Sequence, residues 1–534
     1  MKKTAILPAL ALALFLAPCA SFAAPSTPGS YSLDFDATKY TVQTSTLDGK
    51  TFSYRAYEGI VYVQHPLDPA YETINIYVPV EYYSARTVGG YTIDNAPIFF
   101  PNSVGGYMPG AAAKPGLDFE GKPNALVVAL SRGLIVAAPG ARGRTLQDGS
   151  GRYTGKAPAA IVDLKAAVRY LRFNDKLIPG SSERIISNGT SAGGGLSALL
   201  GASGDNADYE PYLKALGAAN ARDDVYAVSA YCPITNLDNA DSAYEWLLGG
   251  LTETKASTMG PPPAGAAAAA TGAGAAMAPP AGMPAAAPTG AMGAAGATGA
   301  ALPFGAPPSS GGPMTAEQLA VSARLKALFP AYLDGLGLRK ADGTALALDA
   351  SGDGSFRDYL KSLLIASAQT ALKGGADLSK LDWVTIKDGV VTDIDWAGYV
   401  KYCGRKKAAP SFDGLDLSSG ENSLFGTMSV NAQHFTAFGL ANDASGTGAM
   451  ASADLVRMMN PMAYIGAKGT TTSKYWRIRH GTVDSDTAIA IPAILATRLG
   501  NGGYSVDFAL PWDRPHSGDY DLEELFTWID GICR

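Results

Sequence analysis

Cysteine is scarce in this sequence, with four residues among 534. One of them, Cys19, lies in an N-terminal stretch that we expect to be removed, which leaves Cys232, Cys403 and Cys533. Three cysteines allow at most one intrachain disulfide, with one thiol left over. This scarcity excludes a disulfide-stabilised scaffold, so the chain must rely on a hydrophobic core, for which it is long enough.

Long apolar runs are missing beyond the N-terminus. Residues 1–23 have the pattern of a secretory signal peptide, with Lys2 and Lys3, an apolar stretch over 6–16 and a small-residue site ending at Ala23. The apolar stretch is short for a membrane span of about 20 residues. We therefore expect cleavage after Ala23 and a secreted or periplasmic protein, with a lipoprotein attached through Cys19 as the alternative.

Positive charge is not in excess. The formal net charge is −6, and loss of residues 1–23 removes two lysines and no acidic residue, which makes it −8. Nucleic acids and anionic membrane surfaces attract basic proteins. The charge excludes those partners and leaves a small-molecule substrate as the expected one.

Strand and helix patterns alternate along much of the chain. A helical spacing at 163–173 and a strand-helix pair at 184–187 and 191–200 follow a series of strands. Those strands are a half-buried one at 73–78 and continuous apolar runs, typical of buried parallel strands, at 97–100, 125–129 and 134–138. The alternation predicts an α/β fold with a mostly parallel sheet flanked by helices.

The pattern is interrupted in the middle of the chain. Residues 255–314 contain Lys255 as their only charge and Phe304 as their only aromatic side chain, so they cannot bury a core and are expected to be disordered. A capping box at Thr315 and Gln318 then opens helices at about 316–334 and 355–373. The α/β pattern returns with a strand at 475–479, a helix near 487–499, a strand at 504–510 and a helix from about 521. We expect a discontinuous core of 24–237 and 446–534, and an inserted lid or substrate domain of 238–445.

One stretch of the insertion resembles the start of a calcium loop. Asp349, Ser351, Asp353 and Gly354 have the right spacing, but Leu360 stands where the bidentate glutamate is needed. An ordinary helix start explains these residues, and we expect neither a metal nor a cofactor.

A nucleophile elbow of the form G-x-S-x-G spans 189–193, between a predicted strand and a helix of small residues. This context makes Ser191 the predicted nucleophile. The oxyanion hole of such a site uses the N–H of the next residue, Ala192, and a second N–H from a loop after an early strand. Gly105 or Gly106, after the strand at 97–100, fits that second role.

Histidine is scarce as well, with four residues. The elbow class orders its triad as serine, acid, histidine. His65 precedes the elbow and His434 lies in the insertion, whereas His516 follows the last strand and is the predicted base. His480 directly follows the strand at 475–479, where we expect it to orient the acid loop.

Two carboxylates in that loop compete for the role of triad acid. Asp484 is the predicted acid and Asp486 the competitor. Only one of them can hold the imidazole in the required tautomer, so the other is free for another task.

These motifs together resemble the bacterial tannases (tannin acyl hydrolases), serine esterases that release gallic acid from galloyl esters. The resemblance rests on 101–110, the Ser191 elbow, 480–486 and 516–520, and it covers nearly the whole chain outside the low-complexity segment. It implies an α/β-hydrolase fold with a large inserted lid domain.

The resemblance also implies a ring pocket. Asp486, Lys407 and Glu421 match residues that contact the gallate hydroxyls, and Ile234 matches one that lines the ring. Gly420 stands where a related enzyme has a proline, so part of the apolar wall differs. Carboxylates accept from phenolic O–H groups and an ammonium donates to a phenolic oxygen, which agrees with these roles.

The sequence therefore predicts a secreted serine esterase that hydrolyses galloyl esters through an acyl-enzyme. An esterase for feruloyl or other phenolic acids is the close alternative, because it would use the same triad. A secreted serine peptidase and a non-catalytic binding protein are the alternatives from other classes.

Overall fold

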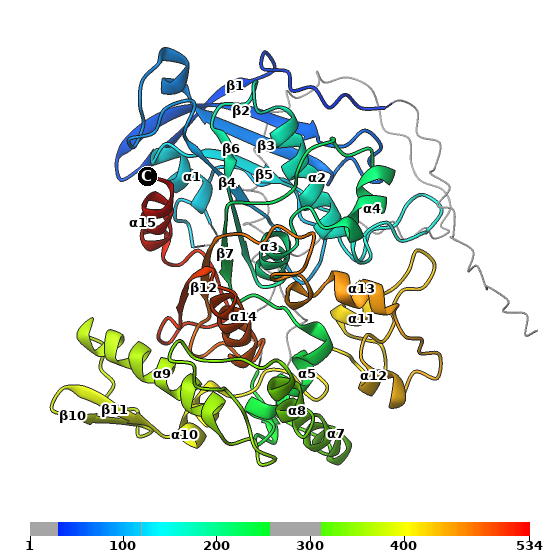
Figure 1. Cartoon of the computed structure of the whole chain (residues 1–534), viewed down its shortest axis with the longest axis vertical. Coiled ribbons are helices and arrows are strands. Elements are labelled where there is room, and N and C mark those ends of the chain that lie inside the picture. The colour runs from blue at the N-terminus through cyan, green and yellow to red at the C-terminus, as the bar shows by residue number, and fades with distance from the viewer. Residues whose placement is uncertain (1–29, 119, 257–310) are drawn as a thin grey trace, which may run out of the picture.

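The computed structural model describes residues 30–118, 120–256 and 311–534 (Figure 1). The predicted signal at 1–23 and most of the low-complexity segment lie outside these residues. Within the described ranges, no helix combines the length and apolar character needed to span a membrane. Cys232, Cys403 and Cys533 are all buried and free, so the one disulfide that the sequence allowed is not formed.

A nine-stranded, mostly parallel sheet forms the centre of the molecule. Three antiparallel strands at one edge are followed by six strands that run parallel to one another. In sheet order the strands are β1 (Thr41–Leu47), β2 (Lys50–Val61), β3 (Thr73–Pro79), β5 (Ile135–Pro139), β4 (Pro97–Pro101), β6 (Ser181–Thr190), β7 (Ala227–Tyr231), β12 (Tyr475–Arg479) and β13 (Ser505–Ala509). Together with the flanking helices, this sheet confirms the predicted α/β-hydrolase fold.

The central strands are buried on both faces, as their apolar runs predicted. Every residue of β4, β5 and β7 is buried. The prediction of a half-buried strand at 73–78 is wrong, because only Thr73 in β3 is partly exposed. Asn75 tolerates this burial because its amide donates to the carbonyls of Ala112 and Ala113, each at 3.1 Å.

The apolar run at 125–129 is a helix rather than the predicted strand. It forms α1 (Ala125–Ser131), and the side chain of Asn124 caps its start by accepting from the N–H of Val127. All its residues except Ser131 are apolar and five of the seven are buried, so the helix has no polar face that would give the run a helical period. A short apolar run of this kind cannot be assigned by periodicity alone, and the capping asparagine was the missed signal.

Helices cover both faces of the sheet (Figure 1). In that view, α1 and the C-terminal α15 lie on one side, and α2 and α4 lie on the other. The ring of Phe526 in α15 packs against Phe99 of β4, with centroids 5.3 Å apart. The flanking helices are α2 (Ala159–Phe173), α3 (Ala192–Ala202), α4 (Glu210–Ala215), α14 (Ala490–Asn501) and α15 (Leu522–Cys533).

The elements between β7 and β12 lie outside the main sheet, and α7, α8 and α9 are at the opposite end of the molecule from β1 and β2 (Figure 1). The predicted capping box of Thr315 and Gln318 is confirmed. The single helix predicted for 316–334 is two helices, with Pro330 in the first turn of the second. These elements are α5 (Leu237–Leu248), α7 (Ala316–Lys326), α8 (Phe329–Gly335), α9 (Ser355–Lys373), β10 (Val384–Lys387), β11 (Val390–Ile394), α10 (Trp396–Cys403), α11 (Gly420–Leu424), α12 (Ala437–Ala441) and α13 (Ala453–Met458).

The two ends of the low-complexity segment are folded against the protein. The short strands β8 (Glu253–Thr254) and β9 (Gly312–Pro313) pair antiparallel. The Lys255 ammonium donates to the carbonyls of Tyr402 and Cys403 at 2.7 and 3.0 Å, and Met314 is buried. The boundaries of 255 and 314 taken from composition are therefore a few residues too wide.

These contacts make the outcome of a deletion depend on where it is cut. Replacing 257–310 by a short flexible linker should leave the melting temperature and esterase activity nearly unchanged, because closing a shorter loop alters stability by only about 1–2 kcal/mol. A matched deletion of 253–314 also removes the β8–β9 pair and Lys255, and should lower the melting temperature. Equal melting temperatures for the two deletions would contradict this assignment.

Candidate active site

Ser191 occupies a sharp turn between β6 and α3. Its backbone has φ of 62°, which an L-amino acid rarely adopts, and its side chain is buried. The Ser191 N–H donates to the carbonyl of Tyr231 at the end of β7, at 3.0 Å. Neighbouring strand ends therefore hold the strained residue in place.

Two glycines of the elbow are required by close backbone approach. A Cβ on Gly189 would lie 2.3 Å from the carbonyl oxygen of Gly193. A Cβ on Gly193 would lie 2.6 Å from Oδ1 of Asn102 and 2.7 Å from the carbonyl oxygen of Val104. The G-x-S-x-G spacing follows from this packing.

The structure brings the three predicted triad residues into one hydrogen-bonded chain. His516, in the loop after β13, has its Nε2 2.8 Å from Oγ of Ser191 and its Nδ1 2.8 Å from Oδ2 of Asp484. Asp484 lies in the loop after β12 and accepts a second bond at Oδ1 from the N–H of Asp486, at 2.9 Å. An imidazole so placed can take the serine proton while the carboxylate holds its tautomer.

The carboxylate of Asp484 stabilises the protonated imidazole of His516. Burial alone would lower the pKa of His516, but Asp484, with Cys232 and Asp486, raises it well above the ordinary value. Burial would raise the pKa of Asp484, but His516 and His480 hold it below the usual range. The pair can therefore hold a proton on His516 when one arrives from the serine.

The other two late histidines have different surroundings. His480 is buried, with its Nδ1 3.6 Å from Oδ2 of Asp484, and neither ring nitrogen has a hydrogen-bond partner among the described residues. His434 lies between Asp413 and Asp443, at 2.7 and 3.1 Å. His434 is thus part of a polar cluster in the inserted elements, which agrees with its exclusion from the triad.

The predicted oxyanion loop lies directly against the elbow. The Asn102 amide donates to the carbonyl of Gly193 and to Oγ of Ser197, at 3.1 and 3.0 Å. Within the described part of the chain, the N–H groups of Gly105 and Gly106 have no acceptor. Ala192 is the first residue of α3, and N–H groups in a first helical turn lack intrahelical acceptors. These donors are therefore available to an oxyanion.

The predicted ring-pocket residues come from four segments, of which the loop after β12 carries Asp486. Ile234 is buried beside the nucleophile, and its N–H donates to the Ser191 carbonyl at 3.2 Å. The Lys407 ammonium lies 4.0 Å from the centroid of the Phe412 ring. Glu421 is in the first turn of α11, among the inserted elements.

Two cations near these residues were not predicted. Lys406 Nζ lies 2.6 Å from Oδ2 of Asp486, next to the predicted Lys407. Arg144 donates from Nε to the carbonyl of Gly106 at 2.9 Å. Burial lowers the pKa of Arg144, and Glu421 partly offsets that effect. No motif marks either residue, although the pair of adjacent lysines was visible.

Gly420 borders the Arg144 guanidinium. A Cβ there would lie 3.1 Å from Nη2 of Arg144, so a side chain at this position would require the guanidinium to shift by a few tenths of an ångström. This close contact favours glycine at the position where a related enzyme has a proline.

Cys232 lies next to the triad. Its Sγ is 3.9 Å from Nε2 of His516 and 3.4 Å from the carbonyl oxygen of Ser517. Cys232, Asp484 and His516 each place a potential metal-ligand atom within 4.8 Å of the others. Both nitrogens of His516 are already bonded to Asp484 and Ser191, so the geometry fits a triad with a neighbouring thiol better than a metal centre.

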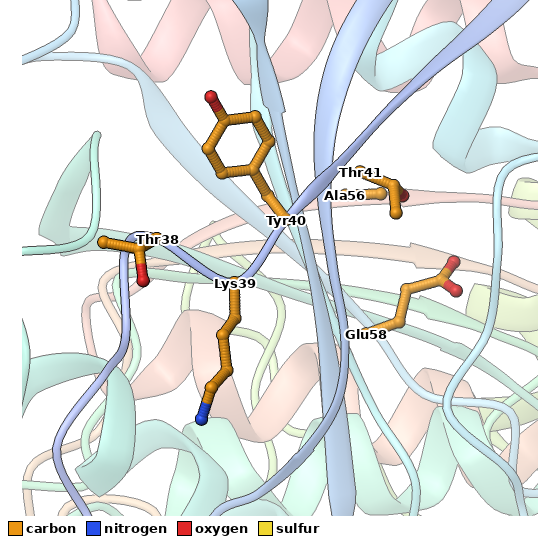
Figure 2. A pocket seen from close by; sticks show the side chains of 6 residues that line it. All are labelled: Thr38, Lys39, Tyr40, Thr41, Ala56 and Glu58. Atoms are coloured by element: carbon orange, nitrogen blue, oxygen red, sulfur yellow. The ribbon is translucent and has the colours of Figure 1, made fainter.

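A shallow hollow of about 300 Å³ lies beside β1 and β2 and is formed by residues near the N-terminal end of the described chain (Figure 2). Its lining includes Lys39, Tyr40 and Glu58 around β1 and β2, and Figure 2 shows the Lys39 side chain pointing away from Glu58. The lining contains none of the triad residues, so the hollow is not the candidate active site.

Comparisons with known proteins place the chain in a family. The family model BD-FAE matches residues 151–274, and a comparison with curated proteins gives no match. The tannase of Fusobacterium nucleatum is 47% identical, with a TM-score of 0.83, over 94% of this chain and 100% of that one.

Two further solved structures agree with this match. The tannin acyl hydrolase of Lactobacillus plantarum is 43% identical, with a TM-score of 0.82, over 94% of this chain and 99% of that one. A tannin acyl hydrolase in complex with ethyl gallate is 44% identical with the same TM-score and coverage. The chain therefore belongs to the tannase family of carboxylic-ester hydrolases, as its motifs predicted.

Proposed function

We propose that this protein is a secreted serine esterase that hydrolyses galloyl esters and releases gallic acid through an acyl-enzyme. The observation that carries the proposal is the chain from Ser191 through His516 to Asp484, with Asp486 two residues from the acid. The relative solved with ethyl gallate supports the same class of substrate. The basic and apolar pattern of residues 1–23 supports secretion.

The reaction follows from the positions of the three side chains. Ser191 Oγ attacks the ester carbonyl as its proton passes to Nε2 of His516. The N–H of Ala192 and that of Gly105 or Gly106 stabilise the oxyanion. His516 then protonates the departing alcohol, and a water activated by the same imidazole releases the acid from Ser191.

In this proposal, charged residues of the site bind the hydroxyls of the acyl ring. Gallate presents three adjacent phenolic hydroxyls, and the carboxylates of Asp486 and Glu421 can accept from them. The Lys407 ammonium can donate to a phenolic oxygen, and Ile234 supplies apolar contact. A hydroxyl-rich ring is therefore the substrate that this set of side chains fits.

Removal of the nucleophile is the first test. Ser191→Ala should lower kcat by about four orders of magnitude or more and leave the melting temperature nearly unchanged, because only one buried oxygen is lost. Ser362→Ala is the matched control, since Ser362 Oγ bonds only within α9. Near-normal turnover by folded Ser191→Ala protein would rule out the serine mechanism.

The pH profile tests the base and the acid. His516 must be neutral to accept the serine proton, so kcat/KM should fall as the pH drops through its pKa. Because Asp484 raises that pKa, the acid limb should lie above about 6.5, the value for an ordinary imidazole.

Substitution of each aspartate then identifies the acid. Asp484→Asn should move the acid limb to lower pH and reduce activity by about 10⁴-fold. If Asp486→Asn has these effects and Asp484→Asn does not, the roles of the two aspartates are exchanged.

The ring pocket is tested with two esters of one alcohol. Glu421→Gln, Lys407→Met and Asp486→Asn should each lower kcat/KM for methyl gallate by about 10- to 150-fold, corresponding to roughly 1.5–3 kcal/mol per hydrogen bond to a charged group. Methyl benzoate, which lacks the hydroxyls, should lose much less. Glu317→Gln, at the start of α7, is the control for Glu421→Gln. Equal losses for both esters would show that these residues do not read the hydroxyls.

A further inference from the structure

Lys406 makes the closest charged contact to Asp486. Its Nζ lies 2.6 Å from Oδ2, and the two side chains are only 23% and 20% exposed. The contact uses one carboxylate oxygen, and among the described residues Oδ1 of Asp486 has no hydrogen-bond partner. The ion pair therefore holds Oδ2 of Asp486 in place, and Oδ1 can accept a hydrogen bond from another group.

The backbone on both sides of this pair is fixed by one buried hydroxyl. The Tyr244 hydroxyl donates to the carbonyl of Ser485, which lies between Asp484 and Asp486, at 2.9 Å. The same oxygen accepts from the N–H groups of Lys406 and Lys407, each at 3.1 Å. The spacing between the lysine pair and the acid loop is therefore set by α5 and not by the lysine side chains.

A second buried group fixes the lysine segment from the other side. Arg405 and Glu245 form an ion pair with both side chains fully buried, with Nη2 and Oε1 2.6 Å apart. Arg405 Nε also donates to the carbonyl of Lys407 at 2.9 Å. Separating the partners of a buried ion pair leaves an uncompensated buried charge and is strongly destabilising, so this pair holds its segment in place. Lys406 is thus held at Asp486 by its own backbone.

The charges explain why a cation is needed at this position. Asp484 and Asp486 are two residues apart, and two ionised carboxylates at such a distance repel each other. Burial raises the pKa of Asp486, but His516, Lys407 and Lys406 together bring it below the usual value. Burial lowers the pKa of Lys406, but Asp486 and Asp484 more than offset this. Lys406 and Asp486 therefore stabilise each other's charged forms.

We propose that Lys406 is a specificity-determining positioning residue, which fixes the Asp486 carboxylate so that its free oxygen accepts from a phenolic hydroxyl of the acyl ring. This inference rests on the proposed function, because it requires a hydroxylated ring beside Asp486. Lys406 acts through Asp486 and does not take part in acyl transfer. Its loss should therefore change which ester the enzyme prefers more than how fast the triad reacts.

The test compares methyl gallate with methyl benzoate in the full-length protein. Lys406→Met should lower the ratio of kcat/KM for gallate over benzoate by at least about tenfold, since one hydrogen bond to a charged group is weakened. Lys406→Arg retains the cation and should recover most of the ratio. Because both esters are measured on one preparation, the ratio does not depend on the fraction of protein that folds.

A matched variant controls for loss of a lysine–aspartate pair elsewhere. Lys361 Nζ lies 2.7 Å from Oδ1 of Asp393, between α9 and β11, and Lys361→Met should leave the ratio unchanged. A lowered ratio in this control as well would overturn the assignment to Lys406.

The pH dependence of the same ratio separates a charge effect from a packing effect. The titratable and charged groups that face Asp486 are Asp484, His480, His516, Lys406, Lys407 and Tyr244. Both esters depend equally on His516, so its titration cancels in the ratio. Loss of Lys406 raises the pKa of Asp486, so the ratio in Lys406→Met should fall as the pH drops, while the wild-type ratio stays level. An unchanged ratio in Lys406→Met at every pH would overturn the inference. A wild-type enzyme without preference for gallate would instead overturn the proposed function.

Discussion

The backbone turn at Ser191 is the constraint on which the site depends. A residue with φ of 62° is stable only if its neighbours fix it, and here the Tyr231 carbonyl and the closely packed glycines do so. The same turn directs Ser191 Oγ towards His516 and leaves the first N–H groups of α3 free. Its position at the end of β6, between β4 and β7, means that the loops after both neighbouring strands can reach it.

The loop after β12 carries two carboxylates with different tasks. It carries Asp484, which orients the base, and Asp486, which we propose reads the ring. The elements between β7 and β12 hold this loop through Tyr244 of α5 and Tyr399 of α10, which donate to the carbonyls of Ser485 and Thr482 at 2.9 and 3.0 Å. A disturbance in the inserted elements therefore affects both reaction and recognition.

The sequence predicted the parts of the molecule that local patterns control. The elbow at Ser191 is visible because backbone geometry restricts which residues fit there, and the order of serine, acid and histidine in that class then indicates His516. The helix at 125–131 was missed because its apolar run lacks a period, and β3 was misjudged because Asn75 is buried against carbonyls from a distant loop. Lys406 and Arg144 could not be predicted, since their partners are far away in the chain and either could equally have been a solvated surface charge.

The pairing of β8 with β9 brings two distant points of the chain together. Thr254 and Gly312 are partners in an antiparallel pair, where opposing Cα atoms lie about 4.5–5.5 Å apart. A domain whose own N- and C-termini are equally close together can be inserted between these two residues without distorting the enzyme. The position thus offers a natural attachment point for a reporter domain or a surface anchor, on an enzyme whose two termini would both remain unmodified.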